Sequence, residues 1–174
     1  RWWAGIGLGG KLYGLPCNTE HLLIFDPSSI TDPVTFVDTR KIATGEGKWR
    51  SLVAMGGKLI GIPDRADTML IYDFVSKQAS GIDTRKLAKG QLKWQAAVSL
   101  AGKVYGIPLN AEKLFIFDPK KAPSRWNGYP CKSDAVSGVD TSHIATGKLK
   151  WLAGLSVGGK VVGVPCNAEA LLVY

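Results

Sequence analysis

Cysteine, histidine and methionine are scarce in this sequence, which has 3 cysteines, 2 histidines and 2 methionines among 174 residues. The cysteines, Cys17, Cys131 and Cys166, are odd in number and lack zinc-type spacing, which argues against a complete disulfide framework and a zinc site. We therefore expect free thiols, which favour a reducing intracellular compartment. Long apolar runs are also missing, since none approaches the roughly eighteen residues of a membrane-spanning helix. The sequence thus predicts a soluble protein without a transmembrane segment.

Motifs of the large enzyme classes are absent as well. The sequence contains no Gly-x-Ser-x-Gly, no phosphate-binding Gly-x-x-x-x-Gly-Lys-Ser/Thr and no His-Glu-x-x-His. His21 and His143 stand at unrelated positions, and neither lies near a serine or cysteine pattern typical of a nucleophile and its base. No acidic cluster within one stretch of chain offers the several ligands that a metal ion needs. We therefore predict no catalytic residue, no cofactor and no metal site, and expect a protein that is not an enzyme.

Acidic residues are outnumbered in this chain. Its 14 aspartates and glutamates face 22 lysines and arginines, which gives a formal charge of +8 and an isoelectric point near 9.5. This excess of positive charge indicates an anionic partner, and the candidates are an acidic protein surface, nucleic acid and a layer of lipid headgroups. The alternative is that the basic residues only keep the surface soluble. The 21 glycines and 9 prolines favour short strands joined by turns.

Repetition is the most prominent feature of the sequence. A basic residue followed by tryptophan occurs four times, at spacings of 47, 45 and 57 residues, as Arg1-Trp2, Lys48-Trp49, Lys93-Trp94 and Lys150-Trp151. Nine residues after each tryptophan stands a lysine that follows glycine, and a Gly-x-Pro triplet comes shortly after it. These landmarks divide the chain into units at about 1–47, 48–92, 93–149 and 150–174, the last of which is incomplete.

Each unit has the pattern of four antiparallel strands. The first segment, such as Trp94–Leu100, alternates between two faces, and a tight turn leads from it into a second short strand. The third segment, such as Leu114–Phe117, is continuously apolar, which predicts a strand covered on both faces. A weaker fourth strand follows around Val136–Asp140. The aspartates after the third and fourth strands, such as Asp118 and Asp140, are expected to close turns by accepting backbone N–H groups.

A four-stranded unit of about 45 residues cannot cover both of its own faces, so it must stack on copies of itself; radial stacking of such sheets is the β-propeller. A flat solenoid is the rival architecture, but solenoid strands are usually parallel and their repeats shorter. We predict an all-β chain of propeller blades, with residues 1–174 forming one propeller domain or part of one. Because the sequence opens on Arg1 and its fourth unit breaks off at Tyr174, we expect a larger protein of which this chain is a part.

The motifs follow one another in a fixed order. Lys-Trp, Gly-Lys-x-Tyr-Gly-x-Pro, Asn-Ala and an apolar run closed by aspartate are most complete at Lys93-Trp94, Gly102–Pro108, Asn110-Ala111 and Leu114–Asp118. This order resembles a propeller-like repeat common in proteins of unicellular algae and other protists. It is more distantly similar to the kelch repeat, although proline stands where kelch strands usually end in a glycine pair. The resemblance covers the whole chain and implies the propeller architecture, but it implies no particular activity.

Two sets of basic residues recur at the two ends of the first strand. In a ring fold, each set is expected to form a circle of positive charge that holds phosphates or acidic side chains. The alternative is that they are solvated turn residues whose stems pack over neighbouring aromatics. The first set is Arg1, Lys48, Lys93 and Lys150, and the second is Lys11, Lys58, Lys103 and Lys160.

An insertion at about Lys120–Asp134 lengthens the third unit by about twelve residues and breaks the repeat. Loops that a framework does not require are where binding function concentrates, and a basic segment with aromatic residues is typical of an interface anchor. The alternative is an idle loop. The candidate partner-binding residues in the insertion are Lys120, Lys121, Arg125, Trp126, Tyr129 and Lys132.

The leading functional hypothesis is a non-catalytic interaction or scaffold module. It predicts an accessory subunit of a larger assembly that docks onto an acidic protein surface through its basic faces and the insertion. One alternative is an enzyme or small-ligand binder that uses the central mouth of the ring, where residues of different blades converge. A weaker alternative is sequence-independent binding of nucleic acid.

Overall fold

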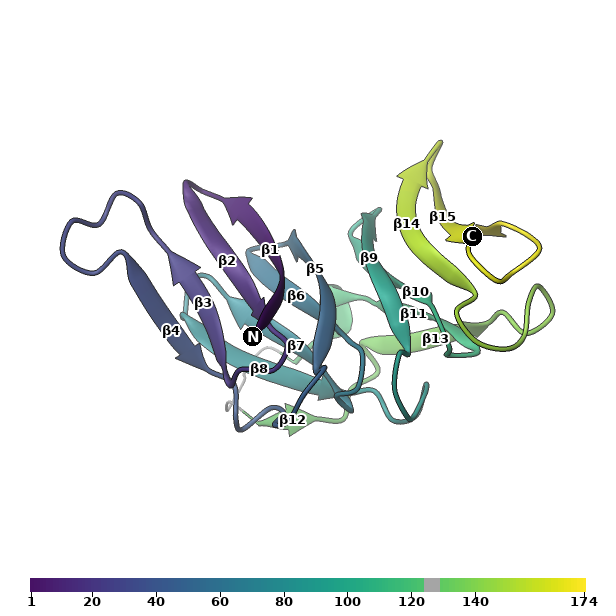
Figure 1. Cartoon of the computed structure of the whole chain (residues 1–174), viewed down its shortest axis with the longest axis horizontal. Helices are drawn as coiled ribbons and strands as arrows, with labels where there is room; N and C mark the ends of the chain where they lie inside the picture. The colour runs from purple at the N-terminus through teal and green to yellow at the C-terminus, as the bar shows by residue number, and fades with distance from the viewer. Residues whose placement is uncertain (124–128) are drawn as a thin grey trace.

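The chain folds into a row of antiparallel β-sheets, one for each unit of the repeat. The computed structural model describes residues 1–123 and 129–174, and it contains four sheets, which we call blades 1 to 4. In Figure 1 the blades follow one another in chain order along an arc, with blade 1 and blade 4 at opposite ends. The predicted all-β propeller architecture is confirmed.

The strands fall close to the predicted segments. Blade 1 consists of β1 (Trp2–Leu8), β2 (Lys11–Pro16), β3 (His21–Phe25) and β4 (Val34–Asp38). Blade 2 consists of β5 (Trp49–Met55), β6 (Lys58–Pro63), β7 (Thr68–Asp73) and β8 (Gln78–Asp83). Blade 3 consists of β9 (Trp94–Leu100), β10 (Lys103–Pro108), β11 (Lys113–Phe117) and β13 (Val136–Asp140). Blade 4 consists of β14 (Trp151–Val157), β15 (Lys160–Pro165) and β16 (Leu172–Val173).

Each blade is a meander in which consecutive strands pair. The turn between β5 and β6 is Gly56-Gly57, with φ angles of +59° and +74°, values that glycine adopts without strain and that match the twist of a two-residue hairpin. After the third strand, Asp73 accepts the backbone N–H groups of Val75 and Ser76, both at 2.9 Å. The aspartates at the strand ends therefore close turns, as the sequence predicts.

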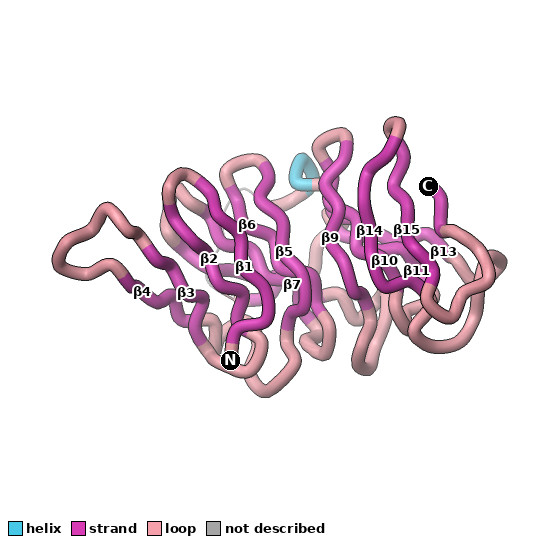
Figure 2. Tube along the Cα trace, turned by 45° about the horizontal axis from the view of Figure 1, so that its top comes forward, coloured by secondary structure: helices cyan, strands magenta, loops and turns pink. Residues whose placement is uncertain are grey.

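The hydrophobic core lies between neighbouring blades. One cluster joins Ile60 and Ile71 of blade 2 to Trp94 and Phe115 of blade 3, and each of the other clusters likewise joins two adjacent blades. The first strands β1, β5, β9 and β14 are neighbours along one side of the arc (Figures 1 and 2). The blades therefore bury their faces against one another, with their first strands nearest the axis of the arc.

The repeated tryptophans fasten the strands within each blade. In blade 3, the indole Nε1 of Trp94 donates a hydrogen bond of 2.8 Å to the backbone oxygen of Lys113, across the intervening strand. Trp2, Trp49 and Trp151 donate in the same way to the carbonyl nineteen residues further along. A tryptophan at this position thus supplies apolar surface to the core while its only polar group is satisfied.

The insertion leaves blade 3 and runs to blade 2. It begins with a 3-10 turn, η1 (Pro119–Lys121), and contains the short strand β12 (Pro130–Cys131). This strand pairs in parallel with β8, with Pro130 opposite Gly81 and Cys131 opposite Ile82, so blade 2 has a fifth strand at its outer edge. The insertion is therefore bound to the framework on both sides of residues 124–128.

Candidate functional site

The first set of basic residues does not form an exposed ring, which corrects the sequence-based expectation. Lys48, Lys93 and Lys150 are each 1% exposed. The ammonium group of Lys93 donates to the backbone oxygens of Ala66, at 2.7 Å, and Gly90, at 3.3 Å. These lysines therefore bind the loop of the preceding blade, and only Arg1 of this set lies at the surface.

The same hydrogen bonds recur at every junction between blades. Lys48 donates to the backbone oxygens of Thr19 and Gly45, and Lys150 donates to those of Ala111 and Gly147. Burial lowers the pKa of all three lysines from the usual value of 10.5. A buried ammonium is costly unless its donors are satisfied, and the carbonyls supplied by the neighbouring loop meet that need.

The second set of basic residues is largely paired. Lys11 lies 2.7 Å from Asp26, Lys58 lies 2.5 Å from Asp73 and Lys103 lies 3.6 Å from Asp118. These are the aspartates that close the third strand, so each lysine neutralises a carboxylate of its own blade. Three members of the expected circle of positive charge are thus ion-paired in the structure, and the fourth, Lys160, is exposed.

The insertion brings the remaining predicted residues together only in part. Lys120 and Lys121 lie in or beside η1, while Arg125 and Trp126 lie outside the described residues. Tyr129 is half exposed, and the ammonium group of Lys41 lies 5.1 Å from the centre of its ring. Lys132 follows β12 directly, so the pairing of β12 with β8 places it at the edge of blade 2.

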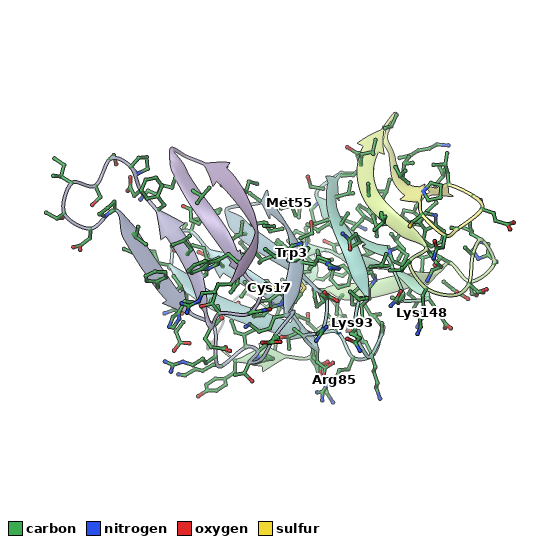
Figure 3. The ribbon with its side chains drawn as sticks, viewed as in Figure 1. Trp3, Cys17, Met55, Arg85, Lys93 and Lys148 are labelled. Carbon is green, nitrogen blue, oxygen red and sulfur yellow. The ribbon has the colours of Figure 1, made fainter. Side chains whose placement is uncertain are left out.

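A groove lies where the insertion meets the end of β8. Its volume is about 760 Å³, and its lining consists of Asp83, Arg85, Lys86, Lys89, Lys132, Ser133 and Asp134. We call it the cationic groove, because four of these residues are basic and two are acidic. Arg85 projects from the lower edge of the molecule in Figure 3.

The charges in the cationic groove are unevenly satisfied. Both carboxylate oxygens of Asp83 accept hydrogen bonds from the guanidinium of Arg85, and this contact lowers the pKa of Asp83. Lys86 reaches the backbone oxygen of Ser133 at 3.0 Å and lies 3.8 Å from the exposed Asp134. Within the described part of the chain, Lys89 and Lys132 form no ion pair. Two exposed ammonium groups are therefore free to bind an anionic group.

A second, smaller cavity lies near the start of strands β1 and β5, among the loops that join blades 1, 2 and 3. It has a volume of about 210 Å³, and Trp3, Arg50 and Asp64 are among its lining residues. The guanidinium of Arg50 lies 4.9 Å from the ring centre of Trp3, 3.6 Å from the Asp64 carboxylate and 3.2 Å from the Gln95 side-chain oxygen. We call this cluster the Arg50 site; it joins residues of blades 1, 2 and 3.

The sequence signal for the Arg50 site is a departure of blade 2 from the repeat, and the shared landmarks do not include it. Blade 2 reads Pro63-Asp64-Arg65 where blade 1 reads Pro16-Cys17-Asn18. Asp64 takes the structural role that Asn18 has in blade 1. The Oδ1 atom of Asp64 accepts a hydrogen bond of 2.5 Å from the backbone N–H of Leu92, and the Oδ1 atom of Asn18 accepts one from the backbone N–H of Gly47. Burial raises the pKa of Asp64, and the nearby Arg50 opposes that rise.

Neither the cationic groove nor the Arg50 site contains a recognisable metal centre among the described residues. Across residues 1–123 and 129–174, no three histidine, cysteine or carboxylate side chains come together in the way that a metal ion requires. All three cysteines are free in the structure. In the same part of the chain, no helix has the length and hydropathy needed to cross a bilayer.

Comparison with known proteins adds information on the fold alone. The sequence matches no protein-family model and no curated protein. A streptogramin B lyase structure matches 99% of this chain and 68% of its own, with a TM-score of 0.57 and 10% identity. The extracellular domain of BT4673 from B. thetaiotaomicron matches 98% of this chain and 23% of its own, with a TM-score of 0.62 and 12% identity. Hydrazine synthase of Kuenenia stuttgartiensis matches 95% of this chain and 46% of its own, with a TM-score of 0.53 and 13% identity.

These likenesses support a propeller-type all-β fold. Identities of 10 to 13% are too low to carry an activity from those proteins to this one. The chain corresponds to about half or less of two of the three structures. Function therefore has to be argued from the cationic groove and the Arg50 site.

Proposed function

We propose that the chain is a non-catalytic protein-binding module, an accessory part of a larger assembly, that takes an acidic segment of a partner protein into the cationic groove. The observation that carries this proposal is the pairing of β12 with β8, which holds the insertion against blade 2 so that Lys132 lines the same groove as Lys89. Exposed ammonium groups attract carboxylates, and when they stand on a rigid framework little conformational entropy of the binding protein is lost on association.

The size of the groove suits a side-chain cluster of a partner better than a large planar surface. Its 760 Å³ lies within the range of about 300–1,000 Å³ of ordinary ligand sites. Tyr129, half exposed on the same insertion, is an aromatic residue of a type common at the centre of interfaces.

The test measures binding of a fluorescein-labelled octaglutamate peptide by fluorescence anisotropy at low ionic strength. The double variant Lys89→Glu, Lys132→Glu is expected to bind at least about tenfold more weakly, because two attractive charges become repulsive. The matched control is Lys148→Glu, an exposed lysine on the linker between blades 3 and 4, which is expected to bind nearly as the wild type does. Equal binding by the double variant contradicts the proposal.

A second arm of this experiment separates protein from nucleic acid as the partner. A single-stranded oligonucleotide of equal charge replaces the peptide, and salt is titrated in both cases. Tighter binding of the oligonucleotide with a steep loss of affinity in salt would favour nucleic acid and overturn the protein-partner proposal.

A second candidate function is the binding of a small carboxylic acid at the Arg50 site. It is favoured by the guanidinium of Arg50, which is stacked on the exposed Trp3 at the edge of a 210 Å³ cavity. A saturating small ligand raises the melting temperature. Acetate, succinate and citrate are suitable probes, and Arg50→Gln should abolish any shift they cause; no shift with the wild type opposes this function.

We also propose that the chain belongs to the repeat family of algal and protist proteins and is distantly related to the kelch repeat. Both relationships are supported by the basic residue, tryptophan, Gly-Lys and Gly-x-Pro landmarks, which keep the same order in all four units, and by the matching sheet that each unit forms. The free thiols are consistent with a reducing compartment. A biotin-labelling experiment in living cells, with the chain fused to a proximity-labelling enzyme, would report its compartment and neighbours.

A further inference from the structure

Blade 2 departs from the repeat at three charged positions, and all three line the Arg50 site. The charged residues are Arg50, Asp64 and Arg65, whereas the other blades have uncharged residues at these positions. Those residues are Trp3, Gln95 and Leu152 at the first position, Cys17, Leu109 and Cys166 at the second, and Asn18, Asn110 and Asn167 at the third. The framework of a blade therefore does not require these charges. Local departures of this kind are expected at functional sites.

Asp64 is a buried carboxylate with one oxygen that accepts no hydrogen bond. Only 5% of the residue is exposed. Its Oδ1 atom accepts the backbone N–H of Leu92, and its Oδ2 atom lies 3.6 Å from Nε of Arg50, which is longer than a hydrogen bond. Among the described residues, Oδ2 has no donor and is not enclosed by protein atoms, so it opens onto the cavity. Because a buried carboxylate is costly unless donors surround it, this oxygen favours a ligand that donates.

Arg50 has hydrogen-bond donors that the protein does not use. The ring of Trp3 lies against its guanidinium, and the side chain is 19% exposed. A guanidinium has five N–H donors. Within residues 1–123 and 129–174, the guanidinium of Arg50 makes a single hydrogen bond, from Nη1 to the Gln95 side chain at 3.2 Å. The planar fork of the remaining donors suits a carboxylate, to which arginine can donate two parallel bonds.

A second guanidinium is held at the same cavity. The side chain of Arg65 lies across Gly47, where an added Cβ would come within 2.9 Å of Cδ and 3.0 Å of Nε. The backbone N–H of Arg65 donates to the Gly47 oxygen at 2.9 Å, and the N–H of Gly47 donates to the side chain of Asn18, also at 2.9 Å. These bonds connect the loops of blades 1 and 2 to the linker between them, so the walls of the cavity are fixed by the fold.

The charges around the cavity balance. Its lining contains two guanidiniums, of Arg50 and Arg65, and two carboxylates, of Glu46 and Asp64. A simple carboxylate that binds Arg50 meets Asp64 as a like charge at close range, which opposes binding. A ligand with a positive group next to its carboxylate is attracted by both residues instead. The volume of about 210 Å³ equals that of about seven water molecules, at roughly 30 Å³ each, so the ligand is small.

We propose that the Arg50 site binds a small α-amino acid with an uncharged side chain. The carboxylate of the ligand lies on the guanidinium of Arg50, and its ammonium group donates to Oδ2 of Asp64. A single carbon atom separates the two charged groups of an α-amino acid, which matches the opposite charges of Arg50 and Asp64 that lie 3.6 Å apart. This inference rests on the second candidate function, because an amino acid is one class of carboxylic acid, and it states which class the site prefers.

Isothermal titration calorimetry with three matched sets of probes tests the proposal. Glycine, L-alanine and L-valine are compared in turn with acetate, propionate and isovalerate, which lack only the amino group. They are also compared with methylamine, ethylamine and isobutylamine, which lack only the carboxylate. At least one amino acid is expected to bind at least about tenfold more tightly than both of its matched compounds, because only the amino acid contacts Arg50 and Asp64 together.

Two variants assign the contacts. Arg50→Gln is expected to weaken the binding of amino acids and of the matched acids alike. Asp64→Asn is expected to weaken the amino acids at least about tenfold and the matched acids by less, because it removes the partner of the ammonium group. The new amide can still accept the N–H of Leu92, as the amide of Asn18 accepts that of Gly47. The matched control is Asp32→Asn, which removes an exposed carboxylate between β3 and β4 and is expected to bind as the wild type does. Circular dichroism and melting temperature verify that each variant is folded.

The outcomes separate this inference from the function on which it rests. Equal affinity of every amino acid and its matched acid overturns the inference but still supports a site for carboxylic acids, and so does an affinity for amino acids that Asp64→Asn does not lower. If no amino acid binds while succinate or citrate raises the melting temperature, the inference alone is wrong. If none of these compounds binds, both are wrong.

Discussion

Replacing Lys93 by methionine should separate the two contributions of a buried lysine to the junction between blades. Methionine keeps most of the apolar stem but removes the ammonium group, which donates to the carbonyls of Ala66 and Gly90. An unsatisfied buried acceptor costs about 1–3 kcal/mol, and part of that loss is offset because a charge no longer has to be buried. We expect Lys93→Met to lower the free energy of unfolding by about 1–3 kcal/mol.

Removing the stem as well should cost more. Lys93→Ala adds a cavity beside the buried junction, and we expect a total loss of about 3–5 kcal/mol. Urea denaturation followed by tryptophan fluorescence measures both values. Lys89→Met is the matched control, because Lys89 is an exposed lysine on the same linker and its replacement should change stability by less than about 0.5 kcal/mol.

The pH dependence gives an independent check of the same reasoning. Burial lowers the pKa of Lys93 below 10.5 in the folded chain, so between that lowered value and 10.5 the unfolded chain binds a proton that the folded chain has released. The free energy of unfolding of the wild type should therefore rise with pH in this window relative to that of Lys93→Met. Equal stability of wild type and Lys93→Met, or a difference that does not change with pH, would refute the role assigned to the ammonium group.

Three further measurements test other features of the fold. Gly154→Ala should destabilise the chain by about 1–3 kcal/mol, because the added methyl group would overlap blade 3, whereas Gly7→Ala, which meets open space, should not; denaturation curves of the two variants decide this. Asp73 has a pKa of about 2 because a lysine and backbone N–H groups bind its carboxylate, so its stabilising effect should be lost as pH falls from 3.8 to 2, and Asp73→Asn should remove that part of the acid sensitivity in pH-dependent melting. Burial raises the pKa of Cys131, so mass spectrometry should find it alkylated more slowly than the exposed Cys166; equal rates would contradict the packing of β12.

The strand order could be predicted from the sequence because every signal for it is local and repeated. The alternation after Trp94, the turn at Ala101-Gly102 and the apolar run to Phe117 lie within one unit, and four copies in phase remove the ambiguity of any single one. The same signals predict the turns closed by aspartate, since an Asp side chain reaches backbone groups only two or three residues away.

The burial of the basic residues could not be predicted in the same way. A lysine beside a tryptophan has the composition of a surface turn, and its carbonyl partners lie far away in the sequence: Lys93 donates to Ala66, 27 residues earlier, and Lys150 donates to Ala111, 39 residues earlier. Only the stacking of blades brings these groups together. The lysine therefore changes from a surface residue into an interior one through tertiary structure alone.

One part of the cationic groove could be predicted from the sequence and the other part could not. The insertion stands out because it breaks the repeat, but nothing in Pro130-Cys131 indicates that this segment pairs with blade 2 rather than with its own blade. Asp83 at the end of β8 and Arg85 just after it complete the groove, and both look like ordinary turn residues in the sequence. The Arg50 site could not be predicted from the landmarks that the four units share, because its sequence signal consists of single positions at which blade 2 differs from the other units.

Strand β12 has one more consequence, which concerns unwanted fibre formation. The last strand of a sheet has unpaired N–H and C=O groups along one side, and any extended peptide can add to them. In blade 2, β12 pairs with β8 at Gly81 and Ile82, whereas β4 of blade 1 and β13 of blade 3 are the outermost strands of their sheets. An invading strand, whether from a partner or from a misfolded neighbour, should therefore add more readily along the whole length of β4 or β13 than to β8, where it would first have to displace β12.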